Sequence, residues 1–147
     1  MVNHISHNAD SLNRLRRFAA AVTLDELRRE VGAGWSVASI LLHMAFWDRR
    51  ASLLIARWME DGVQDSPIDS DIVNDSVKEF LLAVPAEAAP RLALKAAEEA
   101  DEAVAKLPPS MLSAIEGHDV HVRLDRAHHR DQHLDEIEKA LSMRHGS

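Results

Sequence analysis

The chain has 147 residues and contains no cysteine. This absence excludes disulfide bonds, thiolate nucleophiles and metal sites that use cysteine ligands. A metal ion bound by this protein would therefore be held by histidine nitrogens and by oxygen atoms. If the protein used a thiol in a reaction, that thiol would come from a small cosubstrate.

Long basic runs are also missing, and 17 lysines and arginines stand against 24 aspartates and glutamates, for a net charge of -7. Binding to the phosphates of nucleic acids needs clustered positive charge. We therefore expect no nucleic acid partner. The acidic balance mainly serves solubility.

No apolar run approaches the roughly 20 residues that a membrane helix needs. The N-terminus carries His4, His7 and Asp10 in place of a basic region followed by an apolar one, so we expect no signal peptide. The sequence thus favours a cytoplasmic protein without membrane contact.

Strand-like alternation is not convincing anywhere, whereas apolar residues recur at helical spacing. The expected helices cover residues 5–22, a short stretch after Thr23, residues 37–60, 73–84 and 91–107, and a last helix from His118 or Val120 to Met143. No linker marks a second domain, so we expect a single domain over residues 1–147. Four substantial helices with short additional ones predict an all-α fold, a four-helix bundle.

One polar residue interrupts the apolar face of the helix expected in GWSVASILLHMAFWD, residues 34–48. Ser36 is a plausible N-cap, because its hydroxyl can accept a hydrogen bond from the first turn. At about 100° per residue, Ile40, His43 and Trp47 then share one stripe. His43 taken alone is most simply a core histidine satisfied by a hydrogen bond.

The last helix carries a second histidine signal in RAHHRDQHLDEIEKAL. His129 and His133 are four residues apart, one turn from each other on one face, where two imidazoles can share a metal ion. Both flank the apolar stripe that contains Leu134 and Ile137, whereas His128 points away and is interpreted as a surface residue. Such a pair alone also arises by chance on histidine-rich helices.

The zincin pattern HExxH is absent. In HRDQH the second position is Arg130, so the glutamate that would act as general base is missing. Asp131 is displaced from that position by about 100° around the helix. A metalloprotease is therefore disfavoured.

The combination of GWSVASILLHMAFWD with a late HxxxH followed by leucine, here HRDQHLDEI, resembles the DinB superfamily, including its YfiT-like metal-dependent hydrolases. The resemblance implies a four-helix bundle, commonly a homodimer, in which one histidine of the second helix and two of the last bind a divalent metal ion. Carried over residue by residue, the ligands would be His43, His129 and His133. The order of elements matches over nearly the whole chain, and the specific signal lies in these two segments.

A shared cation also accounts for the three histidines physically. Three imidazoles in or beside the core would be costly to bury separately without partners. Imidazole accepts zinc, nickel, copper and iron, of which zinc or nickel is our first expectation. Three neutral imidazoles leave one coordination position open for water or a thiolate.

Two functions of different classes follow. The leading hypothesis is a metal-dependent enzyme acting on a small-molecule substrate, either a transferase that uses a low-molecular-weight thiol, as the resemblance implies, or a hydrolase. The alternative is a non-catalytic helical-bundle protein for binding or stress response, with a structural or vestigial metal site.

Helper residues are less clear from spacing. Glu136 suits orientation of His133 or proton transfer, although we favour a solvated glutamate. Arg126 and Arg130 could hold an anionic substrate group, although we favour pairing with carboxylates. Asn74 is expected in the connection that leads into the third helix, and spacing does not show whether it reaches the site. Two further histidines, His118 and His121, have no partner identifiable from spacing.

Overall fold

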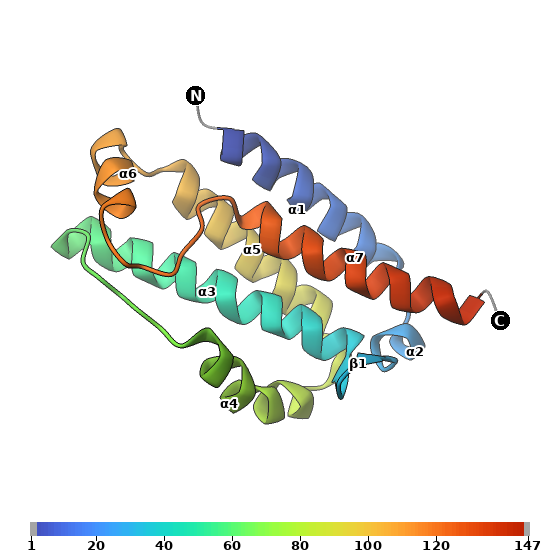
Figure 1. The fold of residues 1–147 in the computed structure, drawn as a ribbon. Coiled ribbons are helices and arrows are strands. Elements are labelled where there is room, and N and C mark those ends of the chain that lie inside the picture. The colour runs from blue at the N-terminus through green and yellow to red at the C-terminus, as the bar shows by residue number, and fades with distance from the viewer. Residues whose placement is uncertain (1–2, 146–147) are drawn as a thin grey trace.

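The computed structural model describes residues 3–145, most of which are helical (Figure 1). The expected all-α class is confirmed, whereas the finer expectation of a DinB-type four-helix bundle stays a prediction. Within residues 3–145, no helix combines the length and the apolar character that a membrane crossing requires. The elements in chain order are α1 (Asn3–Ala21), α2 (Leu24–Leu27), β1 (Glu30–Gly32), β2 (Trp35–Ser36), α3 (Val37–Asp61), α4 (Ser70–Ala83), η1 (Ala86–Ala88), α5 (Ala89–Ala105), α6 (Pro109–Glu116) and α7 (Arg126–His145).

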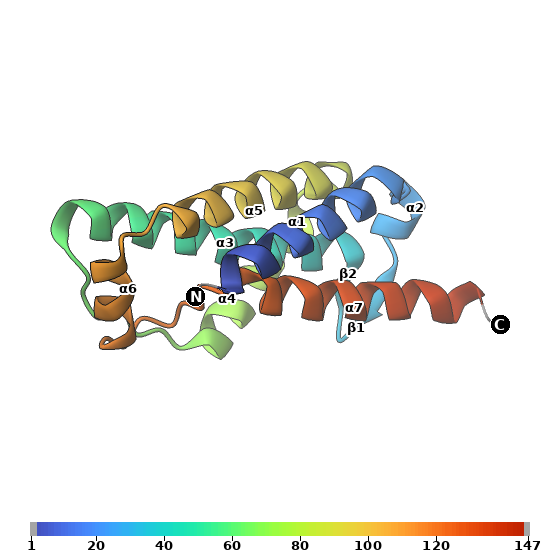
Figure 2. The same ribbon diagram turned by 90° about the horizontal axis from the view of Figure 1, so that it is seen from above.

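Four long helices, α1, α3, α5 and α7, lie side by side along the molecule (Figures 1 and 2). Both α3 and α1 pack against α5 and α7, so each long helix has two long neighbours. The core between them is mainly leucine and isoleucine from α1, α3 and α7, while α5 supplies alanines such as Ala93 and Ala97. Small side chains let helix axes approach closely. The shorter α4 packs on the outside of α3.

Helix α3 begins where the sequence predicts. Ser36 is its N-cap, and the Ser36 hydroxyl accepts a hydrogen bond from the backbone N–H of Ser39 at 3.0 Å. The Ser39 hydroxyl oxygen in turn accepts from the Ser36 N–H at 2.8 Å. This reciprocal cap fixes the start of the helix and hence the direction of His43 two turns later.

A small hairpin, β1 and β2, precedes α3 and was not expected. Its two strands pair antiparallel, and the turn between them contains Ala33 with φ +53° and Gly34 with φ +82°. Strands of two and three residues are too short to show a period of two in the sequence. The expectation of no strand was therefore wrong for this segment.

The last helix begins later than expected. It was predicted to start at His118 or Val120, and α7 begins at Arg126. Arg50 of α3 donates hydrogen bonds to the carbonyl oxygens of Val120 and His121 at 3.1 and 2.8 Å. Because these carbonyl oxygens accept hydrogen bonds from a side chain of α3, they are held outside a helical hydrogen-bond pattern. His121 also adopts a φ of +48°, which a right-handed helix does not allow. The other long helices lie within three residues of their expected bounds.

Candidate metal centre

Three histidines from two helices converge at one point. His43 comes from α3, and His129 and His133 come from successive turns of α7. The His129 Nε2 atom lies 3.2 Å from Nε2 of His43 and 3.1 Å from Nε2 of His133. One ligand atom from each residue lies within 4.8 Å of the other two. The cluster expected from the sequence is therefore confirmed as three histidines close enough to hold a metal ion.

The spacing of these nitrogens suits a shared cation. Tetrahedral zinc with Zn–N bonds of 2.0–2.1 Å places its nitrogen ligands about 3.3 Å apart, close to the two short separations found here. Hydrogen bonding alone explains the cluster less well. The His129 Nε2 atom carries either one proton or one lone pair, so it cannot form a good hydrogen bond with both neighbours at once.

Two of the three imidazoles, those of His43 and His129, are held in the form that binds metals. Burial lowers the pKa of His43 from an ordinary 6.5 to about 4, with a smaller contribution from His133. Burial, followed by the charges of His133, His43, Arg126 and His128, lowers the pKa of His129 to about 2. Both rings are therefore neutral near pH 7, and a neutral imidazole nitrogen is the one that coordinates a metal.

The second ring nitrogens of these histidines have different surroundings. The Nδ1 atom of His133 lies 3.4 Å from the Glu136 carboxylate, whose side chain is 45% exposed. Glu136 is thus both solvated, as we favoured, and near enough to orient His133. The Nδ1 atom of His43 is buried and has no hydrogen-bond partner among the described residues. The His43 ring instead packs edge to face against Trp35, with ring centroids 5.7 Å apart.

A cavity of about 1190 Å³ borders all three histidines. Trp35, Ile40 and Trp47 form part of its wall, which gives the site an apolar side. Asn74 lies within α4 and not, as was expected, in the connection before it. It reaches the cavity and accepts a hydrogen bond from the Trp47 indole N–H at 2.8 Å. This bond connects α4 to α3 beside the site. A fourth ligand would approach the histidines from this cavity.

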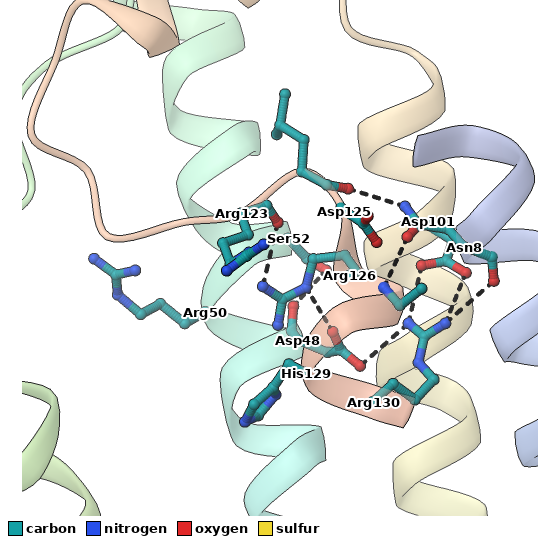
Figure 3. Close-up of polar contacts among 12 residues, drawn as sticks. Asn8, Asp48, Arg50, Ser52, Asp101, Arg123, Asp125, Arg126, His129 and Arg130 are labelled. Atoms are coloured by element: carbon teal, nitrogen blue, oxygen red, sulfur yellow. Dashed lines mark hydrogen bonds and ion pairs between the residues drawn. The ribbon is translucent and has the colours of Figure 1, made fainter. Parts of the chain in front are cut away.

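Two arginines of α7 lie in a buried ionic network beside the histidines (Figure 3). Arg130 donates to both carboxylate oxygens of Asp101, at 3.2 and 2.9 Å, and its Nη2 lies 3.5 Å from Asp48. Arg126 donates from Nε to Asp48 at 2.9 Å. The favoured interpretation, pairing of both arginines with carboxylates, is confirmed.

Sequence reasoning missed Asp48 and Asp101, the carboxylates of this network. Asp48 is 4% exposed and follows an almost uninterrupted apolar stretch of α3, a setting in which a buried acid signals a buried partner. Asp101 gives no such signal, because it lies in the charged sequence EEADEAVAK. Asn8 of α1 was also missed, and its side chain oxygen accepts a hydrogen bond from the Ala127 N–H near the start of α7.

Three other histidines, His118, His121 and His128, lie outside the cluster. His128 is exposed, as expected, although it borders the cavity. His121 also lines the cavity and lies 3.3 Å from the carboxylate of Asp119. His118 is exposed and its Nδ1 lies 2.6 Å from the carbonyl oxygen of Ala114.

No family model, no curated protein and no solved structure matches the chain. The DinB resemblance drawn from the two histidine segments therefore stays a prediction. The homodimer that the resemblance implies stays a prediction as well.

Proposed function

We propose that this protein is a metal-dependent enzyme of the DinB type that acts on a small-molecule substrate. In this proposal His43, His129 and His133 hold one divalent ion, zinc or nickel. The supporting observation is the convergence of three imidazole rings on the wall of a large cavity. The reaction is the attack of a low-molecular-weight thiol, or of water, on an electrophilic substrate.

The donor set fits such an ion. Three histidine ligands without a fourth protein ligand are characteristic of catalytic sites, because structural zinc sites use four protein ligands. Within residues 3–145, no other group of three or more histidines, aspartates or glutamates comes together in the way a metal ion requires. When bound, the ion would supply a positive charge that lowers the pKa of a thiol or water molecule at the open position.

The residues around the histidines provide the rest of the site. Trp35, Ile40 and Trp47 form an apolar wall, which limits water around the reacting groups. Ligand pockets typically measure about 300–1,000 Å³, so this cavity has room for a substrate together with a small thiol. The Glu136 carboxylate can accept the Nδ1 proton of His133, which directs Nε2 of that ring toward the other histidines.

The proposal is tested by turnover. Protein supplied with zinc or nickel should convert small electrophiles in the presence of a low-molecular-weight thiol, or hydrolyse them without one. Activity should disappear on chelation and in His43→Ala, and it should persist in the control His118→Ala, whose exposed ring lies outside both the cluster and the cavity lining. Bound metal with no turnover across a broad panel of electrophiles would favour the alternative, a non-catalytic binding protein.

A further inference from the structure

Arg126 lines the cavity beside His129 with part of its guanidinium unused. The residue is 6% exposed. Its Nε donates to Asp48, and its Nη1 makes a long hydrogen bond of 3.4 Å to the carbonyl oxygen of Arg123. Its Nη2 is shielded from water and has no partner among the residues that the structure describes. Both N–H groups of Nη2 on this buried cation therefore lack acceptors.

Arg130, one turn further along α7, provides the contrast. Its two Nη atoms bind the Asp101 carboxylate in a bidentate manner. Its Nε is also unpartnered, but Arg130 does not line the cavity. Arg130 thus holds helices together, whereas Arg126 combines that role with an unused donor at the cavity wall.

The charges around Arg126 do not balance. Asp48 and the partly buried Asp101 pair with the two buried arginines, Arg126 and Arg130, while the partly exposed Arg50 adds a third guanidinium nearby that pairs with neither carboxylate. Arg50 hydrogen-bonds only neutral oxygens, those of Ser66, Val120 and His121. Burial and then the nearby charge of Arg126 lower the pKa of Arg50. The guanidinium groups outnumber the carboxylates by one beside the cavity, so a single negative charge close to Arg126 would be stabilised.

We propose that the cavity binds a small molecule bearing a carboxylate, and that this carboxylate pairs with Nη2 of Arg126. A carboxylate is a planar monoanion, which matches both the guanidinium geometry and the single excess charge. This inference names a substrate class for the proposed enzyme and in that respect rests on the proposed function. The pairing itself does not require the metal ion.

The placement of Arg126 directs the rest of the ligand toward the histidines. Arg126 precedes His129 by three residues, about 4.5 Å along the helix axis. Both side chains extend from α7 toward α3 (Figure 3). A carboxylate on Arg126 thus brings the adjoining carbon atoms of the ligand close to His129. Because Nη2 is covered, binding of a carboxylate requires that the cavity wall open at this point.

Binding of benzoate to metal-free protein tests this inference, with uncharged benzamide as the matched control. Trp35 and Trp47 line the cavity, so their indole N–H signals in NMR spectra report occupancy. Benzoate should shift these signals saturably and benzamide should not. Arg126→Gln should weaken benzoate binding by about tenfold or more, whereas Arg49→Gln, which removes an exposed arginine paired with Glu99, should leave it unchanged.

Arg126→Lys covers the case in which Arg126→Gln fails to fold, because lysine keeps the charge beside Asp48 and removes Nη2. Equal binding of benzoate and benzamide, or wild-type binding in the folded Arg126 variant, would overturn the inference. A separate zinc titration in carboxylate-free buffer distinguishes the two proposals. Zinc binding without benzoate binding defeats only the carboxylate site, and benzoate binding without zinc binding defeats only the metal centre.

Discussion

The Nε2 atoms of His43 and His129 lie 3.2 Å apart, although 86 positions separate the two residues in the sequence. Helix geometry brings His133 to His129, but only the packing of α3 against α7 brings His43 to both. The metal centre therefore depends on tertiary structure as well as on the ligands themselves.

Each of the three histidines should be needed for tight metal binding. Replacing His43, His129 or His133 with alanine should each lower zinc affinity by more than about 100-fold. Loss of a residue that only hydrogen-bonds to a metal ligand costs up to about 100-fold in affinity, and loss of the ligand itself should cost more. Competition with a chromophoric chelator measures this affinity. His128→Ala is the matched control on α7 and should bind like the wild type. A single alanine variant that keeps wild-type affinity would remove that residue from the ligand set.

Asp48 should be important for folding, because it faces two buried arginines. Asp48→Asn removes the charge that pairs with Arg126 and Arg130, and breaking a buried pair typically costs about 3–5 kcal/mol. Urea unfolding gives the change in the free energy of unfolding. The exposed pair of Arg49 with Glu99 is the comparison, and Glu99→Gln should cost less than about 1 kcal/mol. Equal effects of the two substitutions would show that the Asp48 network contributes no special stability.

The hydrogen bond between Trp47 and Asn74 should hold α4 on α3. Asn74→Ala leaves the partly buried Trp47 indole N–H without its acceptor, at a cost of about 1–3 kcal/mol. Hydrogen exchange should become faster in α4, since this helix has no fully buried residue and is held otherwise by few contacts, such as the partly buried Leu81. Asn13→Ala, which removes an exposed hydrogen-bond acceptor of Arg16, should measurably change neither the free energy of unfolding nor the hydrogen exchange of α4. Unchanged exchange in α4 of Asn74→Ala would contradict this role.

The metal-free protein should lose stability as the pH falls below about 6.5. Unfolded His43 takes up a proton near its ordinary pKa of 6.5, whereas the folded residue stays neutral down to about pH 4. Because the unfolded state binds more protons in this window, acid favours unfolding, by about 2 kcal/mol for His43 between pH 7.5 and pH 5. His43→Leu removes this contribution, so its unfolding free energy should fall less. Parallel pH profiles for the two proteins would contradict the depressed pKa.

The three histidines could be predicted because their signals are local. The position of His43 follows from the Ser36 cap and helical periodicity within a dozen residues, and His129 and His133 are one turn apart. Whether all three side chains meet depends on the tertiary packing of α3 against α7. The sequence indicated this meeting only through the family resemblance and through the cost of burying three imidazoles without partners. The convergence is now observed, whereas the family stays a prediction.

What could not be predicted depends on contacts between distant segments. The late start of α7 at Arg126 depends on hydrogen bonds from Arg50, 76 positions earlier, to the preceding connection. The carboxylate that holds Arg130 is Asp101, one of several acids in a charged helix, and only packing selects it. The unused Nη2 of Arg126 likewise becomes visible only when every partner of the network is known.

The most direct test of the metal centre is elemental analysis of protein purified without a histidine tag and without chelators, beside the variant in which His43, His129 and His133 are all alanine. We predict about one divalent ion per chain in the wild type, zinc or nickel, and almost none in the triple variant. Wild-type protein that is fully heat-stable and contains no metal, or a triple variant that contains as much as the wild type, would contradict the account.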